Sequence, residues 1–183
     1  MKSFKESLAP SLTLVMLCLL VTVALSVTYE VTKPIIANIT KANADAARSE
    51  VLPAGAGGFT VIKGALMPGV VDIYAADNNS GKVITTVDKG YGGEIMVMTG
   101  IDAEGKIQGI KILVHKETPG LGTKAMTAKH LSQFIGQVKI TNTGEAAAAN
   151  IDAITGATLT SNGIYRAVDK ALAQYHELGE AAK

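Results

Sequence analysis

The chain has 183 residues, which leaves room for one folded domain and a short appendage and excludes a multidomain enzyme. Its 17 Lys and Arg residues against 16 Asp and Glu residues give a net charge of +1, so no strong field exists to attract nucleic acid. One cysteine excludes an intramolecular disulfide and a cysteine-ligated zinc or iron–sulfur site built from this chain alone, so redox chemistry would need a borrowed cofactor.

An apolar segment near the amino terminus predicts a membrane anchor. Ser7 to Tyr29 is a run of 23 residues without a charge, long enough to cross a hydrocarbon layer about 30 Å thick. The alternative is a cleaved secretory signal, since Lys2 and Lys5 make a basic start and residues 24–26 resemble a cleavage site. The apolar stretch exceeds the usual signal core of about 7–15 residues, which favours the anchor. The positive-inside rule then places the amino terminus in the cytoplasm and the chain after Tyr29 outside it.

A second helical pattern connects this span to the rest of the chain. Apolar residues recur at approximately helical spacing between Val31 and Ser49, with Pro34 placed to bend or restart the helix. A glycine-rich stretch over residues 52–58 then ends the periodicity and is typical of a loop. The sequence therefore predicts a cytoplasmic tail and transmembrane helix over 1–29, a juxtamembrane helix and linker over 30–58, and an extracytoplasmic domain over 59–183.

Beyond the linker, the period changes from helical to alternating. Val70 to Ala76 is typical of a strand, residues 77–81 of a turn, and residues 83–87 of a second strand. Residues 95–101 and 106–115 alternate likewise, with a turn between them. This pattern predicts an antiparallel meander of strands.

Two helical patterns follow the meander. The first, over residues 124–135, is weak, whereas the second carries Ile164, Val168, Leu172 and Tyr175 on one apolar stripe. Strands first and helices after predict an α+β domain with the helices on one face of an antiparallel sheet.

Three classes of site are disfavoured by the motifs present. The histidines are scattered, without a neighbouring cysteine or paired carboxylate at ligand spacing, so we expect no metal centre. A Gly-x-Ser-x-Gly elbow is missing, which argues against a hydrolase. No Gly-x-Gly-x-x-Gly turn opens a helix after a strand, which argues against the usual dinucleotide site.

Two segments remain that could bind a ligand. The first, His115 to Gly122, ends the meander with a proline and two glycines, and such a backbone can approach a flat ligand closely. An ordinary tight loop is the equally weighted alternative. The second, Asp152 to Ser161, places a run of hydroxyls at the start of the strongest predicted helix, where one of them usually caps it. A helix start with unpaired N–H groups is also a receptor for a phosphate, so the residues predict a phosphate site without identifying the phosphate.

Three motifs, in order, resemble a known family. Thr155-Gly156-Ala157-Thr158, preceded by Asp152 and followed by Thr160, is similar to the Asp-x-x-Ser/Thr-Gly-Ala-Thr signal at which a flavin transferase attaches FMN to threonine through a phosphoester. The Glu117-Thr118-Pro119-Gly120-Leu121-Gly122 loop and the Gly90-Tyr91-Gly92-Gly93 turn resemble the FMN-binding domain of the G subunit of the Rnf electron-transport complex. They resemble the C subunit of the sodium-translocating NADH:quinone reductase less closely. The one departure, Thr155 where serine is common, preserves the hydroxyl.

The resemblance implies that Thr158 carries one covalent FMN, with Thr160 as the acceptor if the register of the motif differs. The phosphate would lie at the start of the carboxy-terminal helix and the ring against the Glu117 to Gly122 loop. Backbone N–H groups of residues 120–122 would stabilise the reduced ring, and Glu117 or Thr118 would position it. Tyr91 or Leu121 would stack against the flavin ring. The alternative for Tyr91 is that it packs in the protein core. The implied cofactor-binding residues are Thr158, Thr155, Gly156, Ala157, Thr160, Ser161, Glu117, Thr118, Gly120, Leu121, Gly122 and Tyr91.

The implied function is electron transport by a single-pass subunit of the cell membrane. It would relay electrons through FMN in an ion-pumping complex that links ferredoxin and NAD, with no complete activity of its own. Its expected partners are the other subunits of the complex, the flavin transferase during maturation and the lipid bilayer, and not nucleic acid. Three alternatives stay open: the C subunit of the quinone reductase, a membrane-tethered FMN-binding redox sensor, and a cofactor-free assembly scaffold in which Thr158 only caps a helix.

Overall fold

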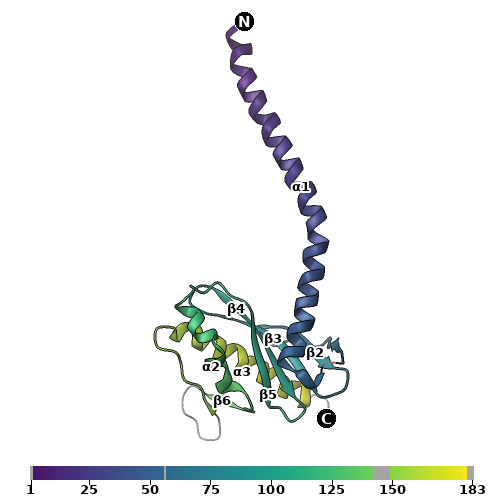
Figure 1. Cartoon of the computed structure of the whole chain (residues 1–183), viewed down its shortest axis with the longest axis vertical. Coiled ribbons are helices and arrows are strands. Elements are labelled where there is room, and N and C mark those ends of the chain that lie inside the picture. Colours follow the sequence, from purple (N-terminus) through teal and green to yellow (C-terminus); the bar gives the residue numbers. More distant parts are fainter. Residues whose placement is uncertain (1, 56, 142–148, 181–183) are drawn as a thin grey trace. The chain divides into compact units, whose positions relative to one another are not determined.

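A computed structural model of the chain describes residues 2–55, 57–141 and 149–180. Its internal contacts divide it into two compact units, Met1–Ala44 and Asp45–Lys183. The second unit holds a five-stranded antiparallel sheet and the carboxy-terminal helix α3 (Figure 1). The predicted α+β class with an apolar amino-terminal helix is confirmed.

Helix α1 runs from Lys2 to Val51 without interruption. The predicted anchor and juxtamembrane helices are therefore one element, and Pro34 does not restart a helix. Within the described part of the chain, Ser11–Lys33 is the one segment long and apolar enough to cross a membrane, with a mean hydropathy of 2.3. Thr22 in this segment donates its hydroxyl to the carbonyl oxygen of Cys18 at 2.7 Å, which satisfies the polar group inside the helix.

The sheet is a meander whose spatial order follows the chain. Its strands are β1 (Phe59–Val61), β2 (Val70–Ala76), β3 (Gly81–Lys89), β4 (Glu94–Asp102) and β5 (Ile107–Val114). Strands β2 to β5 lie where the alternation predicts them, and β1 was not predicted. The tight connections use left-handed backbone, with φ of 59° at Asn79 and 86° at Gly105.

One face of the sheet is covered by α3, which runs from Thr158 to Glu180. The predicted apolar stripe is confirmed, because Ile164, Val168 and Leu172 are buried against the strands. Thr86 on β3 donates to the carbonyl oxygen of Ala167 at 2.8 Å, which adds a polar contact between helix and sheet. The weak helical pattern over 124–135 is instead divided into η2 (Gly122–Met126), α2 (Ala128–Leu131) and η3 (Ser132–Phe134).

The other face is covered by the last two turns of α1, so the prediction of helices on one face is wrong. The buried residues of this second cluster are Ala47, Val51, Leu52, Ala76, Val83 and Met98. Gly100 on β4 pairs with Gly109 on β5, and a Cβ at either position would collide with the backbone of Val51. The two missing side chains let the helix backbone lie directly on the strands.

Three short elements complete the second unit. A 3-10 turn, η1 (Pro53–Gly55), follows α1, and strands β6 (Ile140–Thr141) and β7 (Ala149–Asn150) form a parallel pair. None of these three was predicted, because elements of two or three residues carry no detectable period.

Candidate functional site

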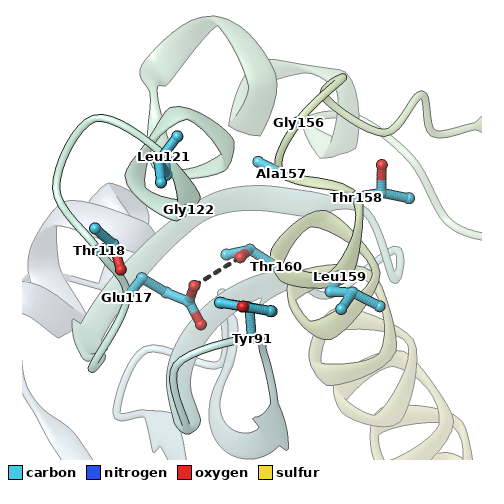
Figure 2. Close-up of a pocket in the computed structure, with 10 residues that line it drawn as sticks. All are labelled: Tyr91, Glu117, Thr118, Leu121, Gly122, Gly156, Ala157, Thr158, Leu159 and Thr160. Atoms are coloured by element: carbon cyan, nitrogen blue, oxygen red, sulfur yellow. Dashed lines mark hydrogen bonds between the residues drawn. The ribbon is translucent and has the colours of Figure 1, made fainter.

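A cavity of about 300 Å³ lies between the loop that follows β5 and the start of α3 (Figure 2). This volume is at the low end of the range for small-molecule pockets. Each of the three sequence motifs contributes to the lining, which consists of Tyr91, Glu117, Thr118, Leu121, Gly122, Gly156, Ala157, Thr158, Leu159 and Thr160. The fold thus brings together motifs that are far apart in the sequence.

The first wall is a β-turn over residues 118–121. The N–H of Leu121 donates to the carbonyl oxygen of Thr118 at 3.2 Å, and Gly120 supplies the φ of 78° that a type II turn requires after proline. The N–H of Gly120 donates to the hydroxyl of Thr123 at 2.9 Å. Two of the N–H groups that we expected to face a ligand are therefore occupied within the loop in this conformation.

The second wall is a similar turn that precedes α3. The N–H of Ala157 donates to the carbonyl oxygen of Ile154 at 2.9 Å, with Gly156 at a φ of 80°. The hydroxyl of Ser161 accepts the N–H of Ile154 at 3.0 Å and ties the turn to the helix. Ser161 itself is buried and does not line the cavity, so its hydroxyl fixes the backbone of the motif.

The amino-terminal end of helix α3 lies at the cavity. Its first α-helical hydrogen bond runs from the N–H of Ser161 to the carbonyl oxygen of Ala157 at 2.9 Å. The N–H groups of residues 158–160 therefore have no acceptor within the helix, and the positive end of the helix dipole lies beside them. This arrangement is suited to an anion such as a phosphate.

A buried carboxylate, Glu117, holds the site together. One oxygen accepts the hydroxyl of Thr160 at 2.8 Å, and the other accepts the N–H of Gly92 at 2.9 Å (Figure 2 shows the first bond). A Cβ at Gly90 or at Gly122 would collide with this carboxylate. The side chain thus joins the loop after β5, the turn after β3 and the first turn of α3.

The threonines of the motif differ in environment. Thr160 is 1% exposed and turned toward Glu117, whereas Thr158 is exposed and points away from that pair in Figure 2. Thr155 is also exposed, but it does not line the cavity. Among these three hydroxyls, that of Thr158 is both accessible and beside the cavity.

Apolar side chains stand around the mouth of the cavity. Tyr91 is 73% exposed, so the alternative that it packs in the core is wrong. Leu121 and Leu159 are also more than half exposed. Leu159 was not predicted, although its position directly after Thr158 at a helix start would have indicated it. Such exposed apolar groups around a concave site are typical of ligand or partner contact.

An ion-pair cluster fixes α3 beside the turn after β3. The Asp88 carboxylate lies 2.7 Å from Nζ of Lys170 and 2.9 Å from an Nη of Arg166. Burial raises the pKa of Asp88, but the hydrogen bonds from Lys170 and Arg166 outweigh this effect and hold the pKa below its usual range. Arg166 also donates to the carbonyl oxygen of Lys89 at 2.8 Å. Sequence reasoning missed this cluster, since Asp88 and its partners are about 80 positions apart.

Comparison with known proteins gives three kinds of match: a domain family, relatives by sequence and a solved structure. Residues 90–173 match the FMN-binding domain family. The G subunit of the Na(+)-translocating ferredoxin:NAD(+) oxidoreductase complex of Acetobacterium woodii is 36% identical over 121 residues, which cover 61% of this chain and 58% of that protein. The G subunit of the ion-translocating oxidoreductase complex of Stutzerimonas stutzeri is 30% identical over 181 residues, which cover 88% of this chain and 78% of that protein.

The crystal structure of Shewanella oneidensis NqrC matches 54% of this chain and 53% of that chain, with a TM-score of 0.45 and 23% identity. The chain spans 58% of the length of the Acetobacterium relative. The Stutzerimonas relative is matched over most of both chains, and the FMN-binding region contains the whole cavity lining. The protein therefore belongs to the family of G subunits of ion-translocating oxidoreductase complexes, and its folded unit contains an FMN-binding domain.

Proposed function

We propose that this chain is a membrane-bound electron carrier that relays electrons through FMN esterified to Thr158, within a complex that links ferredoxin and NAD. The observation that carries the proposal is the position of Thr158, which is exposed at the start of α3 and lines a cavity to which all three motifs contribute. The names of the relatives agree with this role.

The helix start supports a phosphate at this hydroxyl. The N–H groups of residues 158–160, which have no acceptor within the helix, lie at its start beside the cavity, and an ester oxygen on Thr158 would place a phosphate next to them. The ester would form between Oγ1 of Thr158 and the flavin phosphate, while the transferase breaks the pyrophosphate bond of a flavin dinucleotide. A nucleoside monophosphate leaves, and the hydroxyl proton passes to a base of the transferase.

The remaining lining suits a flat, largely apolar ring. Tyr91, Leu121 and Leu159 offer apolar surface at the cavity mouth, and the Thr118 hydroxyl offers a polar contact. When bound, FMN supplies reversible electron transfer, and the protein's part is to hold and orient it. A covalent tether would keep the local concentration of the flavin high outside the cytoplasm, where an unattached cofactor would be lost by dilution.

The amino-terminal helix supports the same role. Ser11–Lys33 is apolar enough to span the bilayer, and Lys2 and Lys5 precede it, so the amino terminus lies in the cytoplasm and the FMN-binding domain outside. One flavin alone has no route for electrons in or out. Other redox subunits of the complex are therefore the partners, and a flavin transferase acts during maturation.

The experiment is coexpression of the full chain with a flavin transferase, followed by in-gel flavin fluorescence of the denatured protein. Fluorescence at the size of the intact chain is expected, together with one FMN on the peptide that contains Thr158. The Thr158→Val variant should show none, because it removes the ester oxygen and keeps the shape of the side chain.

The matched control is Thr127→Val, which alters an exposed threonine that does not line the cavity. It should retain the wild-type fluorescence. Unmodified wild-type chain, or equal fluorescence from Thr158→Val, would contradict the proposal. The first result would favour a cofactor-free scaffold.

A further inference from the structure

The two hydroxyls of the motif point to different sides of α3. Successive residues of an α-helix are rotated by about 100°, so Thr158 and Thr160 are about 200° apart around the axis. When Thr160 faces inward, Thr158 necessarily faces outward. The rotation of this first turn therefore decides which threonine a flavin transferase can reach.

Glu117 contacts the first turn of α3 through the Thr160 hydroxyl and so helps to fix this rotation. Glu117 accepts the Thr160 hydroxyl at 2.8 Å and is itself held by the N–H of Gly92 at 2.9 Å. Glu117 is only 5% exposed, so its hydrogen bonds do not compete with bulk water. The first turn is also restrained by the Ser161 hydroxyl, which accepts the N–H of Ile154, and by the buried stripe of α3, but Glu117 is the side chain that contacts Thr160 itself.

The glycines of the two neighbouring motifs provide the space for this carboxylate. A side chain at Gly90 would collide with one oxygen, and a side chain at Gly122 with the other. A Cβ at Gly92 would collide with the carbonyl oxygen of Lys116, so the turn and the loop lie backbone against backbone. Gly122, which we interpreted as part of a backbone that a flat ligand can approach, therefore also borders Glu117.

We propose that Glu117 is a positioning residue that, through Thr160, sets the rotation of the first turn of α3 and so presents Thr158 to the flavin transferase while withholding Thr160. This inference rests on the proposed function, since it concerns the choice of the acceptor. Glu117 need not touch the flavin for this role.

The test compares four variants of the full chain, each coexpressed with a flavin transferase. Glu117→Ala and Thr160→Val remove the link, and we expect flavin incorporation at position 158 to slow about tenfold, the effect of losing a hydrogen bond to a charged group. Thr160→Ser keeps the hydroxyl. Glu117→Gln keeps an oxygen for Gly92 and can donate its amide to Thr160, so both should retain most of the rate. Peptide mapping of Glu117→Ala should find part of the flavin on Thr160.

A destabilised control separates positioning from folding. Gly100→Ala disturbs the opposite face of the sheet and touches no cavity residue. It should unfold at lower denaturant concentration but incorporate flavin at the wild-type rate. If Glu117→Ala does not fold, the pair Thr160→Val and Thr160→Ser decides the question.

Equal rates for Thr160→Val and wild type would overturn the inference. The inference would also be overturned if Gly100→Ala, at a matched stability, lost as much of the rate of flavin incorporation as Thr160→Val does. The same holds if Glu117→Gln and Thr160→Ser lost as much of that rate as Glu117→Ala and Thr160→Val. In each of these outcomes, Thr158 of the wild-type chain still carries the flavin. Failure of the proposed function is different, because wild-type Thr158 would then carry no flavin.

Discussion

At the scale of single residues, His130 on α2 is a buried titratable group outside the cavity. Its side chain is 1% exposed and packs edge-on against Phe134. Nδ1 lies 3.0 Å from the side-chain nitrogen of Gln133, so Nδ1 accepts and Nε2 carries the proton of the neutral ring. Burial lowers the pKa of His130 and outweighs the opposite effect of the Asp152 carboxylate.

The lowered pKa makes stability depend on pH. The unfolded chain binds a proton at about pH 6.5, whereas the folded chain resists protonation of His130 until a lower pH. Its contribution to the free energy of unfolding is therefore complete above about pH 6.5 and is lost as the pH falls toward the folded value. We expect the thermal midpoint to fall between about pH 7 and pH 5, and the fall to be smaller in His130→Gln. Exposed His176→Gln is the control and should follow the wild type; parallel curves for all three proteins would contradict this assignment.

At the scale of elements, the end of α1 lies directly against the sheet, away from the cavity. A methyl group at Gly100 would collide with the carbonyl group of Val51, and backbone cannot rotate out of the way as a flexible side chain can. We expect Gly100→Ala to lower the free energy of unfolding by about 1–3 kcal/mol, as overpacking does. Urea denaturation would measure this change.

The matched substitution is Gly64→Ala. Gly64 has open space where a Cβ would lie and does not require left-handed backbone. Its stability should change little, or rise slightly because alanine restricts the unfolded chain. Equal midpoints for the two variants would show that the end of α1 does not lie directly on the strands.

The local elements could be predicted because their signals are local. Alternation with turn residues specified β2 to β5, and the apolar stripe specified α3. The second covered face could not be predicted, since Gly100 and Gly109 have the pattern of ordinary strand residues until a helix lies above them. The site was predictable as a set of motifs, but not the opposite environments of Thr158 and Thr160. Those depend on Glu117, which is 43 positions from Thr160.

At the scale of the whole molecule, the boundary of the folded unit differs from the sequence pattern. The pattern places the start of the domain at residue 59, whereas the compact unit begins at Asp45 and includes the last two turns of α1. Val51 and Leu52 are almost fully buried within that unit. The segment before the sheet is therefore part of the core in addition to being a connection to the membrane span.

A pair of fragments tests which boundary is correct. Residues 45–183 should be soluble and unfold cooperatively, because they keep both covered faces of the sheet. The fragment 59–183 lacks Val51 and Leu52, and burial of each of these side chains stabilises the fold by about 1.5–3 kcal/mol. The free energy of unfolding of a typical domain is only about 5–15 kcal/mol. This fragment also exposes Val83 and Met98 on the uncovered face, so we expect a lower urea midpoint and aggregation. Leu52→Ala in the longer fragment should lie between the two, with a loss of about 2–5 kcal/mol. Equal urea midpoints for the two fragments would show that the folded domain begins at residue 59 and that residues 45–58 are a linker. A segment that can be removed without loss of stability contributes nothing to the core.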